Sequence, residues 1–332
     1  MTKERIGFIG VGFMGHGMAK NLVEKGFPLT VMGNRNRAPV ENLLAKGAKE
    51  AKTPAEVAAA SDIVFLCVSD SPTVESLVYG PNGLMAGAHK GMVLVDCSTS
   101  DPTSTLKIIE DMRALGVTVC DAPLGGTPIQ AEEGKLFAMV GCDDDATFAR
   151  IKPAIAAWAG RIEHLGPATT GHKLKLLNNF IAQGYGAIYA EAFALCAKAG
   201  IPATTLYNVI NTGRMDCGYF QTFSAYAAKG QRDSHKFSLR NALKDLRYVE
   251  NMANAAVVSN PVGNAVKNTY ALAVAQGKGD EFVPLVVDVI AAQHDILAGG
   301  LAQGLGLHGQ HGLHQRQQFG GFAQRARRLR LA

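Results

Sequence analysis

The stretch Ile6-Gly7-Phe8-Ile9-Gly10-Val11-Gly12-Phe13-Met14-Gly15 decides the fold of the first half of this chain. Its first four residues resemble a buried strand, its last six have the form G-x-G-x-x-G, and helical apolar spacing continues from Met14 to Glu24. Between a strand and a helix, this motif is typical of dinucleotide binding. Gly10 makes the tight turn, Gly12 lets the backbone approach a pyrophosphate, and Gly15 lets the helix pack on the strand.

We therefore predict a pyrophosphate site at the positive end of the helix that follows the motif. The alternative is a glycine-rich turn that binds no ligand. The residues predicted to form the site are Gly10, Val11, Gly12, Phe13, Met14 and Gly15.

Short apolar runs and helical patterns alternate through the rest of the first half. The further strand-like runs are Leu29–Met32, Ile63–Val68, Met92–Val95 and Val117–Cys120. Strands that alternate with helices predict right-handed βαβ units and an α/β, Rossmann-type doubly wound parallel sheet.

After about residue 165 the strand-like runs stop and only helical patterns remain. The longest covers His172–Lys198, and others run through Thr204–Ile210, Leu239–Met252 and Asn264–Ala275. We therefore expect a nucleotide-binding domain over residues 1–166 and an all-α domain over residues 167–298. Residues 299–332 have no regular hydrophobic period, and we expect a disordered basic tail there.

The net charge of +5 comes from this tail. The chain has 33 Lys and Arg against 28 Asp and Glu. The tail has no Asp, Glu or Lys and five arginines, which are Arg316, Arg325, Arg327, Arg328 and Arg330. The body is therefore neutral and offers no basic face for phosphate neutralisation, so we expect no nucleic-acid partner.

The composition indicates a globular protein, with 47% hydrophobic and 18% charged residues. No run is apolar enough for a membrane span, and the glycines of the first apolar run do not suit a signal peptide, so a cytoplasmic location is expected. The six cysteines form no C-x-x-C pair, and the tail histidines at every third residue from His308 to His314 have no scaffold. No metal site is expected.

The segment Gly33-Asn34-Arg35-Asn36-Arg37 stands where an NAD-binding chain has an acid for the ribose hydroxyls, about twenty residues after the glycine motif. The first acid here is Glu41, and two guanidiniums precede it. We therefore assign Asn34, Arg35 and Arg37 to the cofactor and favour NADP, with NAD possible. The alternative is that both arginines belong to a solvated loop and cofactor choice is relaxed.

Lys175 and Asn179 begin the long helix and lie four residues apart, so they share one face. A lysine amine beside a carboxamide is a candidate pair for proton transfer and substrate orientation. Desolvation beside a cationic nicotinamide would lower the lysine pKa toward the range that acid–base catalysis needs. The alternative for any helix lysine is solvation, and Lys173 exemplifies it.

Four motifs in order resemble the β-hydroxyacid dehydrogenase family, which includes 3-hydroxyisobutyrate dehydrogenases and tartronate semialdehyde reductases. They are Gly7 to Gly15, Asp121-Ala122-Pro123-Leu124-Gly125-Gly126, Lys175-Leu176-Leu177-Asn178-Asn179, and Lys244-Asp245-Leu246. The resemblance covers Ile6 to about Asp295, which is nearly everything except the tail.

The resemblance implies a role for each matching residue. Lys175 matches the catalytic lysine, and Asn179 matches the residue that holds the substrate beside it. Lys244 matches a lysine that closes over the cofactor. The remaining implied contacts are Val68, Ser69, Thr73 and Thr99 with the cofactor, and Ser98 with the substrate beside the nicotinamide.

One departure from the family pattern concerns the acid end of the substrate. Most members read D-A-P-V-S-G-G, where the serine and the following amides bind a carboxylate. Gly125 occupies the serine position here, followed by Gly126 and Thr127. We assign these three residues to the substrate, with a pocket roomier than usual, although Thr127 fits a turn before Pro128 equally well.

The resemblance implies an NAD(P)-dependent oxidoreductase that moves a hydride between the cofactor and a small 3-hydroxy acid or its semialdehyde. Alternative substrates are β-hydroxy amino acids or sulfo-aldehydes. From another class, an NADP-binding assembly module without activity is disfavoured, because Lys175 and Asn179 are both present. Small residues along the helix His172–Lys198 favour close helix packing, so we expect a homodimer or homotetramer.

Overall fold

The structure is a computed structural model that describes residues 3–294 and 296. The predicted tail of residues 299–332, with its histidines and arginines, lies outside the described residues. The chain divides into two compact units, residues 1–184 with 239–279, and residues 185–238 with those from 280 onward. The first unit thus includes helices that the sequence pattern assigns to the all-α domain, and the predicted boundary near residue 166 stays a prediction.

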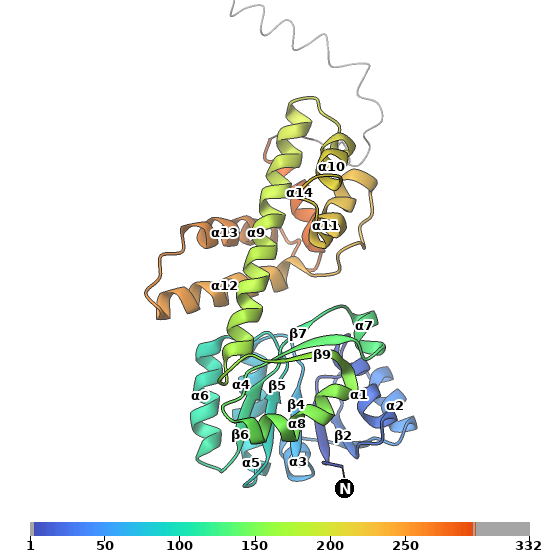
Figure 1. The fold of residues 1–332 in the computed structure, drawn as a ribbon, viewed down its shortest axis with the longest axis vertical. Helices are drawn as coiled ribbons and strands as arrows, with labels where there is room; N and C mark the ends of the chain where they lie inside the picture. Colours follow the sequence, from blue (N-terminus) through green and yellow to red (C-terminus); the bar gives the residue numbers. More distant parts are fainter. Residues whose placement is uncertain (1–2, 295, 297–332) are drawn as a thin grey trace, which may run out of the picture. The chain divides into compact units, whose positions relative to one another are not determined.

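A six-stranded parallel sheet forms the centre of the first unit, and its order is β3-β2-β1-β4-β5-β6 (Figure 1). The strands are β1 (Ile6–Ile9), β2 (Leu29–Met32), β3 (Lys49–Ala51), β4 (Ile63–Leu66), β5 (Val93–Asp96) and β6 (Thr118–Asp121). The predicted doubly wound sheet is therefore confirmed. The strand order reverses beside β1, which places a ligand crevice outside the carboxyl ends of β1 and β4.

Helices cover both faces of this sheet and bury two hydrophobic clusters. Phe8, Phe65 and Val95 belong to one cluster, and their sequence neighbours Ile9, Leu66 and Leu94 belong to the other, as the alternation of a strand requires. The helices are α1 (Gly15–Glu24), α2 (Ala38–Ala45), α3 (Pro54–Ala59), α4 (Ser71–Tyr79), α5 (Leu84–Gly87), α6 (Pro102–Arg113) and α8 (Asp145–Trp158).

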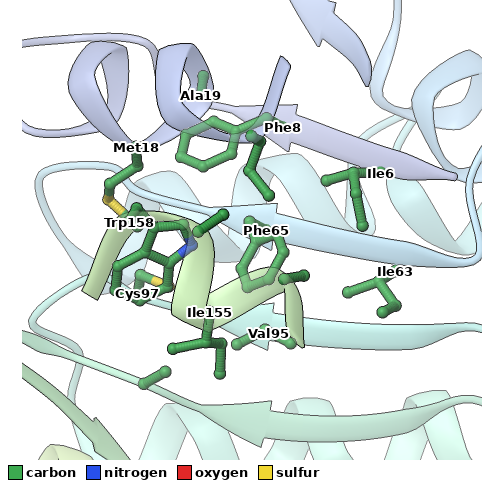
Figure 2. Packing of buried hydrophobic residues seen from close by; sticks show 14 of the residues in the cluster. Ile6, Phe8, Met18, Ala19, Ile63, Phe65, Val95, Cys97, Ile155 and Trp158 are labelled. Atoms are coloured by element: carbon green, nitrogen blue, oxygen red, sulfur yellow. The ribbon is translucent and has the colours of Figure 1, made fainter. Parts of the chain in front are cut away.

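The first cluster is built around aromatic side chains (Figure 2). Phe65 lies with its ring centroid 6.1 Å from that of Phe8 and 6.1 Å from that of Trp158, which meets it edge-on. Met18 and Ala19 of α1 pack against the same cluster. This packing fixes α1 on β1, so the glycine turn between them is held by the core.

A second sheet, which the sequence patterns do not predict, follows β6. It has the order β7-β8-β9, with β7 (Leu124–Gly125) antiparallel to β8 (Leu136–Val140), and β9 (Ala159–His164) parallel to β8. The short helix α7 (Pro128–Glu132) connects β7 to β8. The sheet therefore orders the loop from Gly125 to Thr127.

The remaining elements are helical, as predicted. They are α9 (Thr170–Lys198), α10 (Ala203–Asn211), α11 (Gly218–Lys229), α12 (Leu239–Ala255), α13 (Pro261–Ala275), the 3-10 helix η1 (Val283–Leu285) and α14 (Val286–Ala292). Helix α9 begins in the first unit and ends in the second, whereas α12 and α13 belong to the first.

In the second unit the core combines aromatic side chains with small and aliphatic ones such as Ala190 and Val287. Tyr189 has its ring centroid 5.2 Å from that of Phe220 and 5.7 Å from that of Phe223. Among the described residues, no helix combines the length and the apolar character that crossing a membrane requires.

Candidate active site

The glycine-rich turn after β1 has the geometry that a bound pyrophosphate needs. Gly10 has φ +101°, and a Cβ there would lie 2.2 Å from the carbonyl oxygen of Cys67, while a Cβ on Gly15 would lie 1.9 Å from the Gly10 oxygen. Gly12 differs, because a Cβ there would meet no heavy atom of the described chain within 4 Å, apart from its immediate neighbours. The packing of the chain does not require Gly12, whereas close approach of a ligand would.

A cavity of about 440 Å³ lies beside this turn, and it is lined by Gly12, Phe13, His16, Asn36, Pro39, Pro128, Ile129 and Glu132. Phe13 lines the cavity and is 90% exposed. The side chains of Val11 and Met14 pack against the core, so these two residues would contact a ligand only through their backbone. The residues present therefore fit a dinucleotide.

The two arginines predicted to bind the cofactor differ in whether their guanidinium groups already have a partner. The Arg37 guanidinium forms two hydrogen bonds with the Glu50 carboxylate, at 2.6 and 2.9 Å. The bonds lower the pKa of Glu50. Among the described residues, the Arg35 guanidinium forms no hydrogen bond or ion pair, and its backbone N–H donates to Asn34 Oδ1 at 2.8 Å. Arg35 is thus the freer cation for a ribose phosphate.

The loops after β4 and β5 meet, as the predicted cofactor residues require. The Val68 N–H donates to Ser98 Oγ at 3.0 Å, which uses the hydroxyl of a predicted substrate residue as an acceptor. Lys244 Nζ donates to the carbonyl oxygens of Ser69, at 2.7 Å, and Thr99, at 3.1 Å. Lys244 thus bridges both loops from α12.

Other contacts join α12 to the same two loops. Tyr248 Oη accepts a hydrogen bond from the Ser71 N–H at 3.1 Å, and Asn251 Nδ2 donates to Asp101 Oδ2 at 2.8 Å. The predicted cofactor residue Thr73 lies in the first turn of α4, where its N–H (2.9 Å) and hydroxyl (2.5 Å) both donate to Asp70 Oδ1.

A polar cluster contains Asn179 and Asp245, which are buried, and Lys175 and Lys244, which are half-buried and lie within the electrostatic influence of Asp245. Asn179 Nδ2 donates to Asp245 Oδ2 at 2.6 Å, and Lys244 Nζ lies 3.1 Å from Asp245 Oδ1. Only 1% of Asp245 and 8% of Asn179 is exposed. The cluster therefore brings together three predicted residues, Lys175, Asn179 and Lys244.

Desolvation of the partly buried Lys175 ammonium is the main influence on its pKa, which it lowers below the ordinary value of 10.5. The carboxylate of Asp245 opposes this effect, and the ammonium of Lys244 adds to it. The direction is the one that proton transfer near neutral pH needs.

Asp245 is a site residue that the sequence reasoning missed. It stands in the Lys244-Asp245-Leu246 motif, but only Lys244 has a predicted role. An acid next to Lys244 on an amphipathic helix is the feature of the sequence that could have identified it. In the structure Asp245 orients Asn179 by a charge-assisted hydrogen bond.

The loop proposed for the acid end of the substrate is shaped by local contacts. Gly126 has φ +127°, and a Cβ there would lie 2.8 Å from Leu136 Cδ2, so glycine is required. Thr127 caps α7: its Oγ1 accepts from the Gln130 N–H at 3.3 Å, and its N–H donates to Gln130 Oε1 at 2.9 Å. Among the described residues, this loop has no hydrogen bond or ion pair with Lys175.

Two family models match the chain in succession. Residues 5–166 match the NAD binding domain of 6-phosphogluconate dehydrogenase. Residues 169–290 match the model described as NAD-binding of NADP-dependent 3-hydroxyisobutyrate dehydrogenase.

Several named proteins are similar to this chain over most of its length. The 3-sulfolactaldehyde reductase of Escherichia coli (strain K12) is 31% identical over 274 residues, 82% of this chain and 91% of that protein. The NAD-dependent L-serine dehydrogenase of Pseudomonas aeruginosa is 31% identical over 280 residues, 82% of this chain and 93% of that one. The solved structure of Mycobacterium tuberculosis 3-hydroxyisobutyrate dehydrogenase with L-serine has a TM-score of 0.77 and 26% identity, and the match covers 87% of this chain and 99% of that one.

Proposed function

This chain belongs to the β-hydroxyacid dehydrogenase family of NAD(P)-dependent oxidoreductases, and from that premise we propose that it moves a hydride between NADP and a small 3-hydroxy acid or its semialdehyde. The observation that carries the proposal is the polar cluster of Lys175, Asn179, Lys244 and Asp245, in the unit that also holds the glycine turn. The nicotinamide, when bound, supplies or accepts the hydride.

In the mechanism we propose, Lys175 moves the proton. In reduction its ammonium donates a proton to the carbonyl oxygen, and in oxidation its neutral amine accepts the hydroxyl proton. Desolvation lowers the Lys175 pKa below its ordinary value, which favours the neutral amine more than in a solvated lysine.

Asn179 orients the substrate. Asp245 holds one N–H of its amide, and Asn178 donates to its oxygen at 3.3 Å, so the second N–H is the group that meets the substrate. Lys244 holds the Ser69 and Thr99 loops, which border the cofactor in this proposal.

For the acid end of the substrate we propose the backbone N–H groups of Gly125 and Gly126, with Thr127 beside them. The absence of a serine hydroxyl at Gly125 favours an anionic group different from a simple carboxylate. A second candidate substrate class, sulfo-aldehydes or β-hydroxy amino acids, is supported by the relatives named 3-sulfolactaldehyde reductase and L-serine dehydrogenase.

We propose a homodimer or homotetramer as the working form. Apolar side chains with large exposed fractions recur along α9 at helical spacing, and they are Leu174 (41%), Leu177 (41%), Ile181 (55%), Ile188 (61%) and Leu195 (71%). Such a stripe is typical of helix association. Light scattering on the purified protein measures the oligomeric state, and a monomer at micromolar concentration would contradict this part.

The test of the proposed function is turnover by purified protein with NADPH and a panel of semialdehydes, and with NADP and 3-hydroxy acids, including amino- and sulfo-substituted ones. Lys175→Met should lower kcat by about 10²–10⁴-fold and leave cofactor binding intact. Lys173→Met, which removes an exposed lysine of the same helix, is the matched control. Cofactor binding without turnover of any panel member would favour the assembly module instead.

A further inference from the structure

The residue before helix α9 has a backbone conformation that threonine rarely adopts. Thr169 has φ +78° and is 1% exposed, and the helix that carries Lys175 starts at Thr170. A buried, non-glycine residue in this region is strained, and it persists only where surrounding contacts hold it. The contacts at Thr169 therefore decide where the helix begins.

The carboxylate of Asp121 supplies these contacts. Its Oδ1 accepts a hydrogen bond from the Thr169 N–H at 2.6 Å, and its Oδ2 accepts one from the His172 N–H at 2.6 Å. Free N–H groups at the start of a helix need such acceptors. Asp121 itself is fixed at the end of β6, because its backbone N–H and carbonyl pair with Gly141 at 3.0 and 2.8 Å.

Two glycines leave the space that this carboxylate occupies. A Cβ on Gly141 would lie 2.3 Å from Asp121 Oδ1. A Cβ on Gly171 would lie 2.8 Å from Asp121 Oδ2 and 2.2 Å from the Met139 carbonyl oxygen. Asp121 is 0% exposed, so the carboxylate is enclosed by backbone and the start of α9 is held tightly to the end of β6.

His172 adds a second attachment in the same turn. Its ring Nδ1 lies 3.0 Å from Thr105 Oγ1 in α6, and its Nε2 lies 3.7 Å from Asp96 Oδ2 at the end of β5. Asp96 also accepts a hydrogen bond from the Ser98 N–H at 2.9 Å. The first turn of α9 is thus tied to the loop that holds Ser98, and Lys175 follows one turn later.

We propose that Asp121 is a positioning residue for Lys175. Asp121 holds the strained Thr169 and the first turn of α9 against the ends of β5 and β6. It thereby fixes the position of Lys175 along α9 and the direction in which its side chain leaves the helix. This inference rests on the proposed role of Lys175 in proton transfer. It gives a function to the aspartate that opens the Asp121-Ala122-Pro123-Leu124-Gly125-Gly126 motif, for which the resemblance implies none.

The first test is Asp121→Asn. The amide that replaces the carboxylate has only one oxygen, so its NH₂ group would face one of the two N–H groups of Thr169 and His172 that Asp121 now accepts from. We expect kcat to fall by about 10²-fold, the effect of misplacing a reacting group by about 1 Å, while KM for NADPH stays within about twofold because the glycine turn is untouched. The matched control is Asp144→Asn. Asp144 caps α8 through the Thr147 N–H at 2.7 Å, and α8 carries no predicted site residue, so kcat should be unchanged. Unchanged kcat in Asp121→Asn would overturn the proposal.

A second pair of variants removes the problem of an unstable Asp121→Asn chain. Thr169→Gly accepts a positive φ without strain, so the turn no longer needs the carboxylate in order to fold. Adding Asp121→Asn to Thr169→Gly should lower kcat by less than Asp121→Asn does in the natural sequence, while a loss still remains. Equal kcat in Thr169→Gly with and without Asp121→Asn would overturn the proposal.

A readout independent of turnover separates this inference from the proposed function. The rate of acylation of Lys175 by an amine-selective reagent, followed by peptide mass spectrometry against pH, reports its surroundings, with exposed Lys173 as the internal reference. Asp121→Asn should move the Lys175 profile toward that of Lys173. If Lys175→Met keeps turnover but this shift occurs, the catalytic role is wrong and the positioning geometry stands. If Lys175→Met loses turnover and the profile does not move, the positioning inference is wrong.

Discussion

The polar cluster around Lys175 and the arginines proposed for the ribose site both carry charge, but they differ in burial. Asp245 and Asn179 are 1% and 8% exposed, whereas the Arg37 and Glu50 side chains are 46% and 30% exposed. Buried charges interact strongly and hold one geometry, whereas exposed pairs are screened by water and salt and rearrange readily. We therefore expect the geometry proposed for proton transfer to be fixed more tightly than the geometry that would select NADP over NAD.

Among the variants that test this comparison, Asp245→Asn in the polar cluster is expected to have the largest effect. Asp245→Asn removes the carboxylate that holds Asn179 and that raises the Lys175 pKa. We expect kcat to fall by roughly 10²-fold, because a substrate-orienting group loses its anchor. The Lys175 pKa should also move further down.

The pH profile gives the sign of this shift. In the proposed mechanism carbonyl reduction needs protonated Lys175. The rate should therefore decline as pH rises through the Lys175 pKa, and the decline should begin at lower pH in Asp245→Asn. Lys244→Met should shift it the other way, since Lys244 lowers the pKa. Glu250→Gln, which removes a carboxylate of the same helix paired with Lys267, is the control. An unshifted profile in Asp245→Asn would place Lys175 outside the influence of that carboxylate.

A smaller effect is expected at the glycine turn after β1. Two variants there test which glycine the fold requires and which glycine the cofactor requires. Gly12→Ala should leave the melting temperature unchanged, because its Cβ meets no described atom, and should raise the Kd for NADPH about tenfold, or ~1.4 kcal/mol. Gly10→Ala should instead lower the melting temperature, since φ +101° and the Cys67 oxygen exclude a side chain. Calorimetry measures both quantities, and a large loss of stability in Gly12→Ala would show that Gly12 serves the fold rather than the ligand.

Five of the six strands of the main sheet could be predicted because they carry apolar runs such as Ile63–Leu66. The edge strand β3 was missed, because Lys49-Glu50-Ala51 is largely exposed and has no apolar run. The β7-β8-β9 sheet could not be predicted as a whole, although β8 (Leu136–Val140) is itself a continuous apolar run. Strand β7 has only two residues, and β9 contains Gly160, Arg161 and Glu163, so neither has a strand-like apolar pattern. Their pairing comes from tertiary contacts, which override local propensity.

The same distinction applies to the site. Helical spacing puts Lys175 and Asn179 on one face, and the resemblance to the family distinguishes Lys175 from a solvated helix lysine such as Lys173. Asp245 lies 66 residues from Asn179, and Glu50 lies 13 residues from Arg37, so both partnerships depend on how the chain folds back on itself. The role of Asp121 was hidden for the same reason, because its partners Thr169 and His172 are 48 and 51 residues away.

The smallest effects are expected at the exposed arginines, Arg35 and Arg37, where the variants measure the preference for NADPH over NADH. Arg35→Ala should reduce the ratio of kcat/KM for NADPH to that for NADH by about tenfold, the loss of one charge-assisted hydrogen bond. Arg37→Ala should reduce it less, because Glu50 already engages that guanidinium. Glu50→Gln should raise the ratio by releasing Arg37. If Arg37→Ala instead has the larger effect, the Arg37–Glu50 pair opens when NADPH binds, and the exposed end selects its cofactor by exchanging one anionic partner of Arg37 for another.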